Sequence, residues 1–214
     1  KISNLYEVKQ RAIANLREAG IDVVLVTTIV NTVNNDQVGP ILDFAIENID
    51  VVTTIAYQPV SFTGRDEDIS DQQRRTQRYT LSHLAHDLQR HTGYIEPMRD
   101  VFPLSVLASF ADMTDTLLGG AEKVGSIHCG CHPGCGGGTI LMVNKQTREV
   151  VPLSRFVDVE GLLTDLQEIA DANRGKAATM AQLALALLRR YDPTQAPVDF
   201  DLGTLLRQYL SQTG

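Results

Sequence analysis

Three cysteines and two histidines lie within one eight-residue segment in the second half of the chain. Thiolates bind zinc and iron–sulfur clusters, and imidazoles bind zinc and iron. Five such groups exceed the four ligands of a tetrahedral zinc, and three thiolates could hold three irons of a four-iron cluster. The segment therefore predicts a metal site, with both kinds of metal open. The candidate ligands are His128, Cys129, Cys131, His132 and Cys135.

The spacing of these cysteines, C-x-C-x3-C, differs from the common metal motifs. Zinc ribbons use C-x2-C pairs, and bacterial ferredoxins use C-x2-C-x2-C. Glycines at 130, 134, 136, 137 and 138 allow the sharp bends that turn N–H groups toward sulfur or an anion. The alternative interpretation is a glycine-rich turn with three free thiols. An odd, clustered set of cysteines argues against a disulfide framework, so we expect reduced thiols and a cytoplasmic protein.

The overall composition is that of a globular chain with an acidic surface. Its 214 residues include 19 Lys and Arg against 26 Asp and Glu, a net charge of −7. This balance predicts no general affinity for nucleic acid or anionic membranes. No apolar run approaches the ~20 residues of a membrane span, and no secretory signal opens the chain. The first residue is Lys, and residues 1–20 have the pattern of a fold interior, so we expect a fragment or a processed chain.

The first sixty residues alternate between helical and strand patterns. Apolar residues at helical spacing predict helices over Tyr6–Ala19 and Val38–Asn48. Runs rich in β-branched residues predict strands over Val23–Val30 and Val51–Tyr57, and their weak alternation suits strands covered on both faces. Helix, strand, helix and strand with short connections are typical of a parallel sheet or barrel.

Two polar segments follow these strands, Asn31–Asp36 and Gln58–Arg65. Ligands of parallel α/β folds bind beyond the carboxyl ends of the strands, so these segments are candidates for a binding site. The alternative is that both are solvated turns. A third candidate is the pair His83 and His86, which are three residues apart on a predicted helix over Thr80–His91 and could share a metal. A solvated helix face is the commoner role of such a pair.

The rest of the chain predicts mostly helices around one hairpin. The fold class is therefore α/β, with a first part over residues 1–120 and a second part over residues 121–214. The second part contains the Cys/His segment, the hairpin and the last helices. We expect helices over Val101–Leu118, Val159–Ala172, Ala177–Tyr191 and Gly203–Gln212, and a hairpin of Thr139–Asn144 with Val150–Leu153.

Several segments in order resemble a known enzyme family. Gly20–Val30, Asn34–Gly39 and Gln58–Arg65 look like the later strands of a radical S-adenosylmethionine barrel. The closest branch holds archaeal tetraether-lipid synthases and cobalamin-independent radical methylases. His132–Gly136 and Val151–Val159, with the first hairpin strand between them, are similar to the C-terminal extension of that branch. The resemblance covers most of the chain, and the order of the segments is more specific than any one of them.

This resemblance implies that residues 1–120 are the C-terminal portion of a partial, TIM-like (β/α) barrel and that residues 121–214 are a C-terminal extension. It implies a four-iron cluster held by a C-x3-C-x2-C motif, which reduces S-adenosylmethionine to a hydrogen-abstracting radical. By analogy, four side chains at the strand ends would contact S-adenosylmethionine or substrate. They are Asn31, Asn34, Gln58 and Ser61.

The C-x3-C-x2-C motif does not occur in these 214 residues, and the stretch Phe102–Leu104, where the branch carries further cysteines, has none. We therefore expect part of a radical S-adenosylmethionine iron–sulfur enzyme, for methyl transfer or carbon–carbon bond formation, that is not active alone. The alternative is a non-catalytic domain whose zinc or iron–sulfur site binds a partner. Half a barrel exposes a sheet edge, so we also expect association with a missing N-terminal half or a dimer mate.

Overall fold

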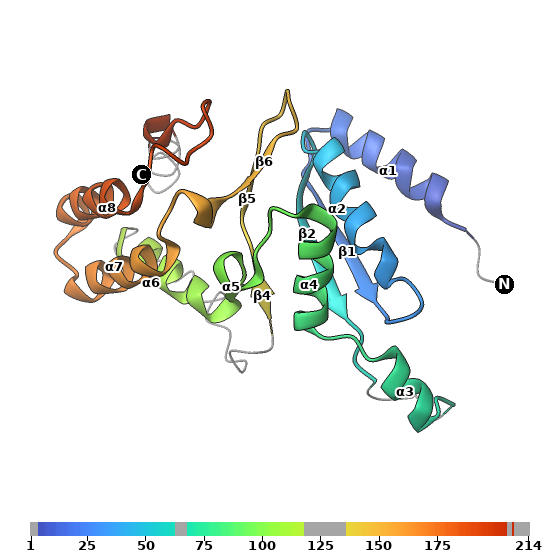
Figure 1. Cartoon of the computed structure of the whole chain (residues 1–214). Helices are drawn as coiled ribbons and strands as arrows, with labels where there is room; N and C mark the ends of the chain where they lie inside the picture. The colour runs from blue at the N-terminus through green and yellow to red at the C-terminus, as the bar shows by residue number, and fades with distance from the viewer. Residues whose placement is uncertain (1–3, 63–67, 118–135, 205–206, 208–214) are drawn as a thin grey trace. The chain divides into compact units, whose positions relative to one another are not determined.

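The computed structural model describes residues 4–62, 68–117, 136–204 and 207. The chain divides into two compact units, one of residues 1–97 with 143–150 and one of residues 98–142 with 151–214 (Figure 1). The division expected at residue 120 stays a prediction, because residues 118–135 lie outside the described part. Among the described residues, no helix is long and apolar enough to cross a membrane.

The first unit contains a parallel pair of strands with helices between and after them. Strands β1 and β2 are hydrogen-bonded in parallel, with Thr28 opposite Gln58 and Ile29 opposite Pro59. This confirms the predicted order of helix, strand, helix and strand. The elements are α1 (Tyr6–Glu18), β1 (Val23–Ile29), η1 (Asn35–Gln37), α2 (Val38–Glu47), β2 (Val52–Pro59), α3 (Asp71–Gln77) and α4 (Leu81–Thr92).

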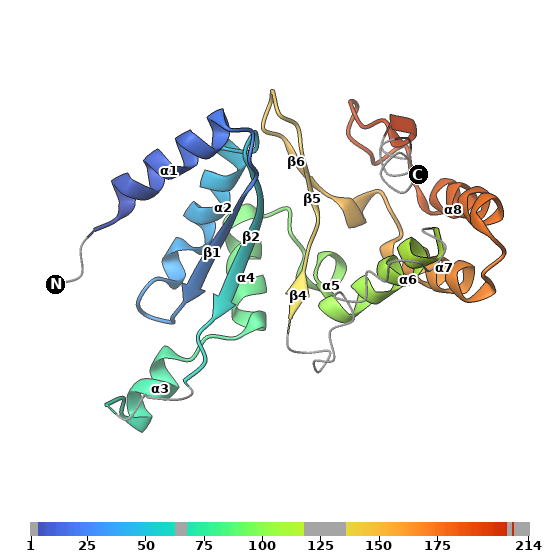
Figure 2. The same ribbon diagram turned by 180° about the vertical axis from the view of Figure 1, so that it is seen from behind.

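Helices cover one face of this two-stranded sheet. Ala45 of α2 packs with Val51 and Val52 in a small core, and partly buried side chains of α1, β1 and β2 join it. Helix α2 in turn contacts α4. Figure 1 shows α2 and α4 in front of the strands, and Figure 2 shows the strands in front of these helices.

No described element of the first unit covers the opposite face of the sheet. Burial alternates along β1, and Val24 and Val26 are 53% and 60% exposed. The sequence led us to expect cover on both faces, but two strands with helices on one side leave the second face bare. The described residues form no closed barrel, so the partial-barrel architecture stays a prediction while the mixed α/β class is confirmed.

Local sequence signals set the ends of α4 and its contact with α2. At the start of α4, the Thr80 hydroxyl accepts from the backbone N–H of His83, and Nδ1 of His83 accepts from the Thr80 N–H. Gly93, with φ 69°, ends the helix. The His91 ring pairs with Asp43 at 2.8 Å between Nε2 and Oδ2. A Cβ built on Gly39 would lie 2.2 Å from this ring, so only glycine fits where the two helices meet.

The second unit is mainly helical. Helices α6, α7 and α8 pack together over the largest apolar cluster, which includes Met113, Phe156, Leu166 and Leu183. Its elements are α5 (Pro97–Asp100), β3 (Phe102–Pro103), η2 (Leu104–Val106), α6 (Leu107–Leu117), β4 (Gly137–Gly138), β5 (Leu141–Val143), β6 (Val150–Pro152), η5 (Leu153–Arg155), α7 (Val159–Ala172) and α8 (Lys176–Arg190). Residues 143–150, at the tip of the β5–β6 hairpin, belong to the first unit.

One helix of this unit starts later than the sequence predicts. The helix expected from Val101 begins only at Leu107, because Pro103 removes a backbone donor and Phe102–Pro103 form β3. In the first unit, the sequence predicted no helix in the charged stretch before Thr80, but the short helix α3 begins at Asp71. Its N-cap is Ser70, whose hydroxyl accepts from the N–H of Gln73. The expected hairpin is confirmed by the β5–β6 pair.

Candidate functional site

The five predicted metal ligands, His128, Cys129, Cys131, His132 and Cys135, lie outside the described residues. The metal site therefore stays a prediction. Within the described part of the chain, no three His, Cys, Asp or Glu side chains are grouped to hold a metal ion.

The two helix histidines that could have shared a metal have local roles. Nδ1 of His83 belongs to the capping box of α4, and its ring stacks on Tyr79 with 5.6 Å between centroids. Nδ1 of His86 lies 3.3 Å from Oε1 of Gln89 on the same helix. These contacts fit the solvated-face interpretation of the pair.

The segment that follows Cys135 in the sequence is held tightly against β3. Strand β4 pairs antiparallel with β3, and the N–H of Leu104 donates to the carbonyl of Gly136 at 3.1 Å. A Cβ built on Gly136 would lie 2.4 Å from Cδ1 of Leu104, and one on Gly137 would lie 3.2 Å from Cγ1 of Val101. Glycines at these positions therefore leave room for the Leu104 and Val101 side chains to pack on the chain.

A buried carboxylate ties the start of β3 to the end of β6. Asp100 is fully buried and accepts from Nε and Nη2 of Arg99 at 2.6 and 2.8 Å. It also accepts from the Ser154 hydroxyl at 2.5 Å. A buried charge is tolerated where it is paired and hydrogen-bonded, and these three donors meet that need. The network joins α5, which precedes β3 in the sequence, to η5, which follows β6.

The carboxyl ends of β1 and β2 bring polar side chains together on the uncovered face. Thr28 and Gln58 are register partners, so their side chains lie on the same face of adjacent strands about 4.8 Å apart. Both residues are exposed, as is Ser61 just beyond β2. Hydroxyl and amide groups both donate and accept hydrogen bonds. Thr28 was not singled out in the sequence, because only the strand register places it beside Gln58.

Asn34 closes the loop that follows β1. Its Oδ1 accepts from the N–H of Val30 at 2.8 Å, and its Nδ2 donates to the carbonyl of Thr28 at 2.9 Å. Asn31 has a similar role, since its Nδ2 donates to the carbonyl of Thr76 at 2.9 Å. Both amides hold backbone in place, and their predicted contact with a cofactor stays a prediction.

The same loop contains an unusual backbone conformation. Thr32 has φ 64°, a left-handed value that is rare for a β-branched residue. The side chain of Asn35 accepts from the Thr32 N–H at 2.8 Å and supports this turn. Such strained residues cost about 1–3 kcal/mol and cluster at ligand sites, so the conformation favours a functional role for the loop.

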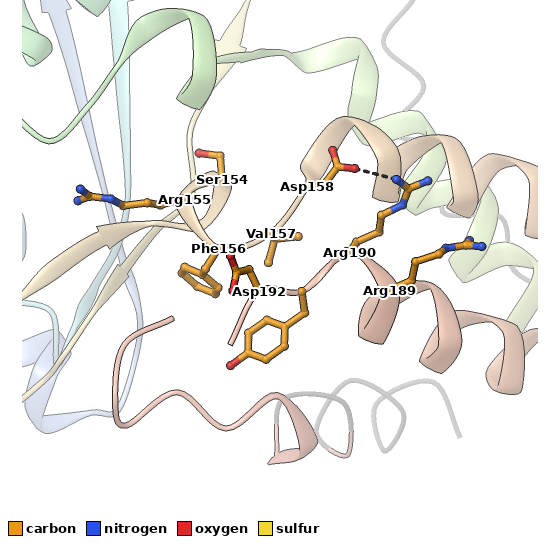
Figure 3. Close-up of a pocket in the computed structure, with 9 residues that line it drawn as sticks. Ser154, Arg155, Phe156, Val157, Asp158, Arg189, Arg190 and Asp192 are labelled. Atoms are coloured by element: carbon orange, nitrogen blue, oxygen red, sulfur yellow. Dashed lines mark hydrogen bonds and ion pairs between the residues drawn. The ribbon is translucent and has the colours of Figure 1, made fainter. Parts of the chain in front are cut away.

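A pocket of about 310 Å³ lies in the second unit between the segments 154–158 and 189–192 (Figure 3). Two of its three arginines, Arg189 and Arg190, are paired with carboxylates of the protein. Arg190 bonds Asp158 and Asp165 at 2.8 Å each, and Arg155 and Arg189 extend in opposite directions away from each other. The Arg190 guanidinium, followed by that of Arg189, holds the pKa of the Asp165 carboxyl below its ordinary value. This pocket is therefore a structural ion-pair region, and the strand ends remain the better candidate site.

Comparisons with known proteins agree with the resemblance seen in the sequence. No protein-family model matches the chain. Over 213 residues, 97% of its length, the chain is 30% identical to the 7,8-dihydro-6-hydroxymethylpterin dimethyltransferase of Methanocaldococcus jannaschii. The chain spans 40% of the length of that relative. This similarity supports a relationship to radical S-adenosylmethionine methyltransferases.

Proposed function

We propose that the chain is part of a radical S-adenosylmethionine methyltransferase, and that the carboxyl ends of β1 and β2 contact S-adenosylmethionine or its methyl acceptor. The observation that carries this proposal is the Thr28–Gln58 pair on the uncovered face, in a chain similar to a methyltransferase along 97% of its length. The site predicted from the sequence, Asn31, Asn34, Gln58 and Ser61, includes one member of this pair.

The donor set at this site fits the polar groups of S-adenosylmethionine. Thr28, Gln58 and Ser61 offer hydroxyl and amide groups for ribose oxygens and the adenine edge. When bound beside a reduced iron–sulfur cluster, S-adenosylmethionine supplies a radical that abstracts hydrogen. The role of the residues in this chain is to bind and orient the reacting molecules, while Asn34 fixes the backbone of Thr28.

We propose a reduced pterin, or a heterocycle of that kind, as the methyl acceptor, since the relative is named for such a substrate. The uncovered sheet face suits this class of molecule. Exposed Val24 and Val26 offer an apolar surface for a flat ring and exclude water from it, and Thr28 and Gln58 offer hydrogen bonds to its polar edge.

The binding proposal is tested by equilibrium dialysis with labelled S-adenosylmethionine. The protein used is a longer polypeptide that contains this chain and spans the whole length of the relative. We expect Gln58→Ala and Thr28→Val each to weaken binding about tenfold, equivalent to about 1.4 kcal/mol. Gln72→Ala serves as the control, because this glutamine is exposed on α3. An unchanged dissociation constant in both strand-end variants would remove the basis of the proposal.

For the Cys/His segment we propose an accessory iron–sulfur cluster, with His128 or His132 able to complete a set of three cysteines. The hydrogen bond from the Leu104 N–H to the carbonyl of Gly136, the residue after Cys135, supports this proposal because it fixes the chain next to a predicted ligand. Anaerobic purification should give a brown protein whose iron and colour are lost in Cys135→Ala and kept in His86→Ala. A colourless protein with one tightly bound zinc would contradict the cluster.

The edges of the two-stranded sheet also lead us to propose a further partner for the first unit, either the rest of a longer protein or a second copy. An unpaired strand edge is ordinarily paired or covered, and a two-stranded sheet is marginal by itself. Light scattering at several protein concentrations tests for the second copy. A strictly monomeric protein whose strand edges are closed by its own elements would count against the proposal.

A further inference from the structure

Helix α3, Asp71–Gln77, is held in place without an apolar face. None of its seven residues is buried, and its sequence, DQQRRTQ, contains no apolar side chain. Short helices are marginal in water, and most gain their stability from the packing of an apolar face. The position of α3 therefore depends on polar contacts.

Asn31, in the loop after β1, makes two such contacts with the end of this helix. Its backbone N–H donates to the carbonyl of Gln77 at 3.1 Å, and its Nδ2 donates to that of Thr76 at 2.9 Å. These contacts place the last turn of α3 next to the carboxyl end of β1, which ends at Ile29. Figures 1 and 2 both show α3 beyond the arrowheads of β1 and β2. Helix α3 therefore lies at the edge of the sheet where we propose that the ligand binds.

Two arginines at the end of α3 have no partner for their charge. Arg75 lies in the last turn, Arg78 is the C-cap residue, and both are exposed. Within the described part of the chain, neither side chain forms an ion pair or a hydrogen bond, whereas Arg74 pairs with Asp71 at 3.8 Å. The pair is also unusual for a chain with a net charge of −7.

A structural role at the end of the helix does not account for these two arginines. Arginines in a last turn commonly bond the final carbonyls of a helix. Here Asn31 already donates to the carbonyls of Thr76 and Gln77. Like charges one helical turn apart also repel each other, so the two guanidinium groups are unfavourable in the free protein. An anion bound between them would remove this repulsion.

We propose that Arg75 and Arg78 bind a phosphate group of the methyl acceptor at the carboxyl ends of β1 and β2. This inference rests on the proposed function of that edge. A guanidinium group is planar, always charged, and presents paired N–H donors that match phosphate oxygens. Two such groups balance a phosphate dianion and exceed the single charge of a carboxylate. A phosphate therefore fits the pair better than the carboxylate of S-adenosylmethionine does.

Inorganic phosphate is the probe for this site. Phosphorus NMR at fixed ionic strength measures its dissociation constant in a titration with the longer polypeptide. We expect the double variant Arg75→Gln, Arg78→Gln to weaken phosphate binding about tenfold, because charge-assisted donors are lost. The double variant Lys145→Gln, Arg148→Gln is the control, since it removes the same charge from exposed positions between β5 and β6. Its phosphate binding should equal that of the parent, and circular dichroism should show that both variants are folded.

Binding of S-adenosylmethionine to the same variants identifies the source of the anion. The arginine variant should bind S-adenosylmethionine as the parent does, because the proposed phosphate belongs to the methyl acceptor. Equal weakening of both ligands would assign the arginine pair to the carboxylate of S-adenosylmethionine and overturn the proposal.

Three results of the phosphate titration would also overturn it. They are no binding by the parent, unchanged binding in the arginine variant, and an equal loss in the control. The proposed function can fail separately, since it depends on S-adenosylmethionine binding in the Gln58→Ala and Thr28→Val variants. A loss of phosphate binding confined to the arginine variant would stand even if those two variants bound S-adenosylmethionine normally.

Discussion

The Ser154 hydroxyl donates a 2.5 Å hydrogen bond to Oδ1 of Asp100, a residue 54 positions earlier in the chain. This bond joins η5 to α5, and the predicted metal ligands lie between these two elements in the sequence. Because Asp100 is fully buried, its carboxylate depends on protein donors in place of water. The bond therefore contributes to the stability of the second unit.

Replacing Ser154 by Ala should destabilise the second unit by about 1–3 kcal/mol, because a buried carboxylate loses a donor. Urea unfolding followed by circular dichroism measures this loss. Ser105→Ala is the matched control, since Ser105 is exposed in η2. Equal midpoints for the two variants would show that the bond contributes nothing to stability.

Asn34 and Gln58 should separate structural support from ligand binding. Asn34→Ala removes two hydrogen bonds to the backbone and should lower the free energy of unfolding by about 1–3 kcal/mol. Gln58→Ala changes an exposed side chain and should leave stability within about 0.5 kcal/mol of the parent. Thermal unfolding of both variants, alongside S-adenosylmethionine binding, checks this difference. A large loss of stability in Gln58→Ala would assign it a structural role instead.

Gly39→Ala should destabilise the first unit by about 1–3 kcal/mol, because the new methyl group meets the His91 ring. The ring would have to move, and its contact with Asp43 would be lost. His91→Ala makes room for the methyl group, so the double variant should be more stable than the sum of the two single effects predicts. Chemical denaturation of all four proteins measures this coupling, and additive effects would exclude the steric explanation.

Asp165 should make stability depend on pH in the acid range. Arg190 first, and then Arg189, lower the pKa of its carboxyl below the ordinary value of 3.8. A carboxyl with a lowered pKa in the folded state stabilises the protein above its ordinary pKa, and this stabilisation is lost as the pH falls through the folded value. The difference in unfolding midpoint between the parent and Asp165→Asn should therefore be largest near about pH 6 and shrink below about pH 4.

Glu168→Gln is the control for this titration, since Glu168 is exposed on the same helix. Its midpoints should follow those of the parent at each pH. If the gap between the parent and Asp165→Asn stayed constant down to about pH 2, ionisation of Asp165 would not be its source.

Local patterns in the sequence were enough to predict most of the secondary structure. The β-branched runs became β1 and β2, the turn after Asn144 became the β5–β6 hairpin, and helical spacing located α7 and α8. Each of these features depends on residues close in the chain. Helix α3 was missed because its seven residues carry no apolar stripe, and its start depends on one cap at Ser70.

The sequence by itself determined that polar groups follow each strand and that the thiols of the chain are gathered in one segment. It also determined that several segments, in their order along the chain, resemble a radical S-adenosylmethionine protein. Only the tertiary structure decided which of these polar side chains are exposed and which bond the backbone. Asn34 and Gln58 are alike in chemistry, yet one amide is bonded within its own loop and the other is exposed beside Thr28. Strand register and burial create this difference, because they depend on residues that are distant in the chain and meet only on folding.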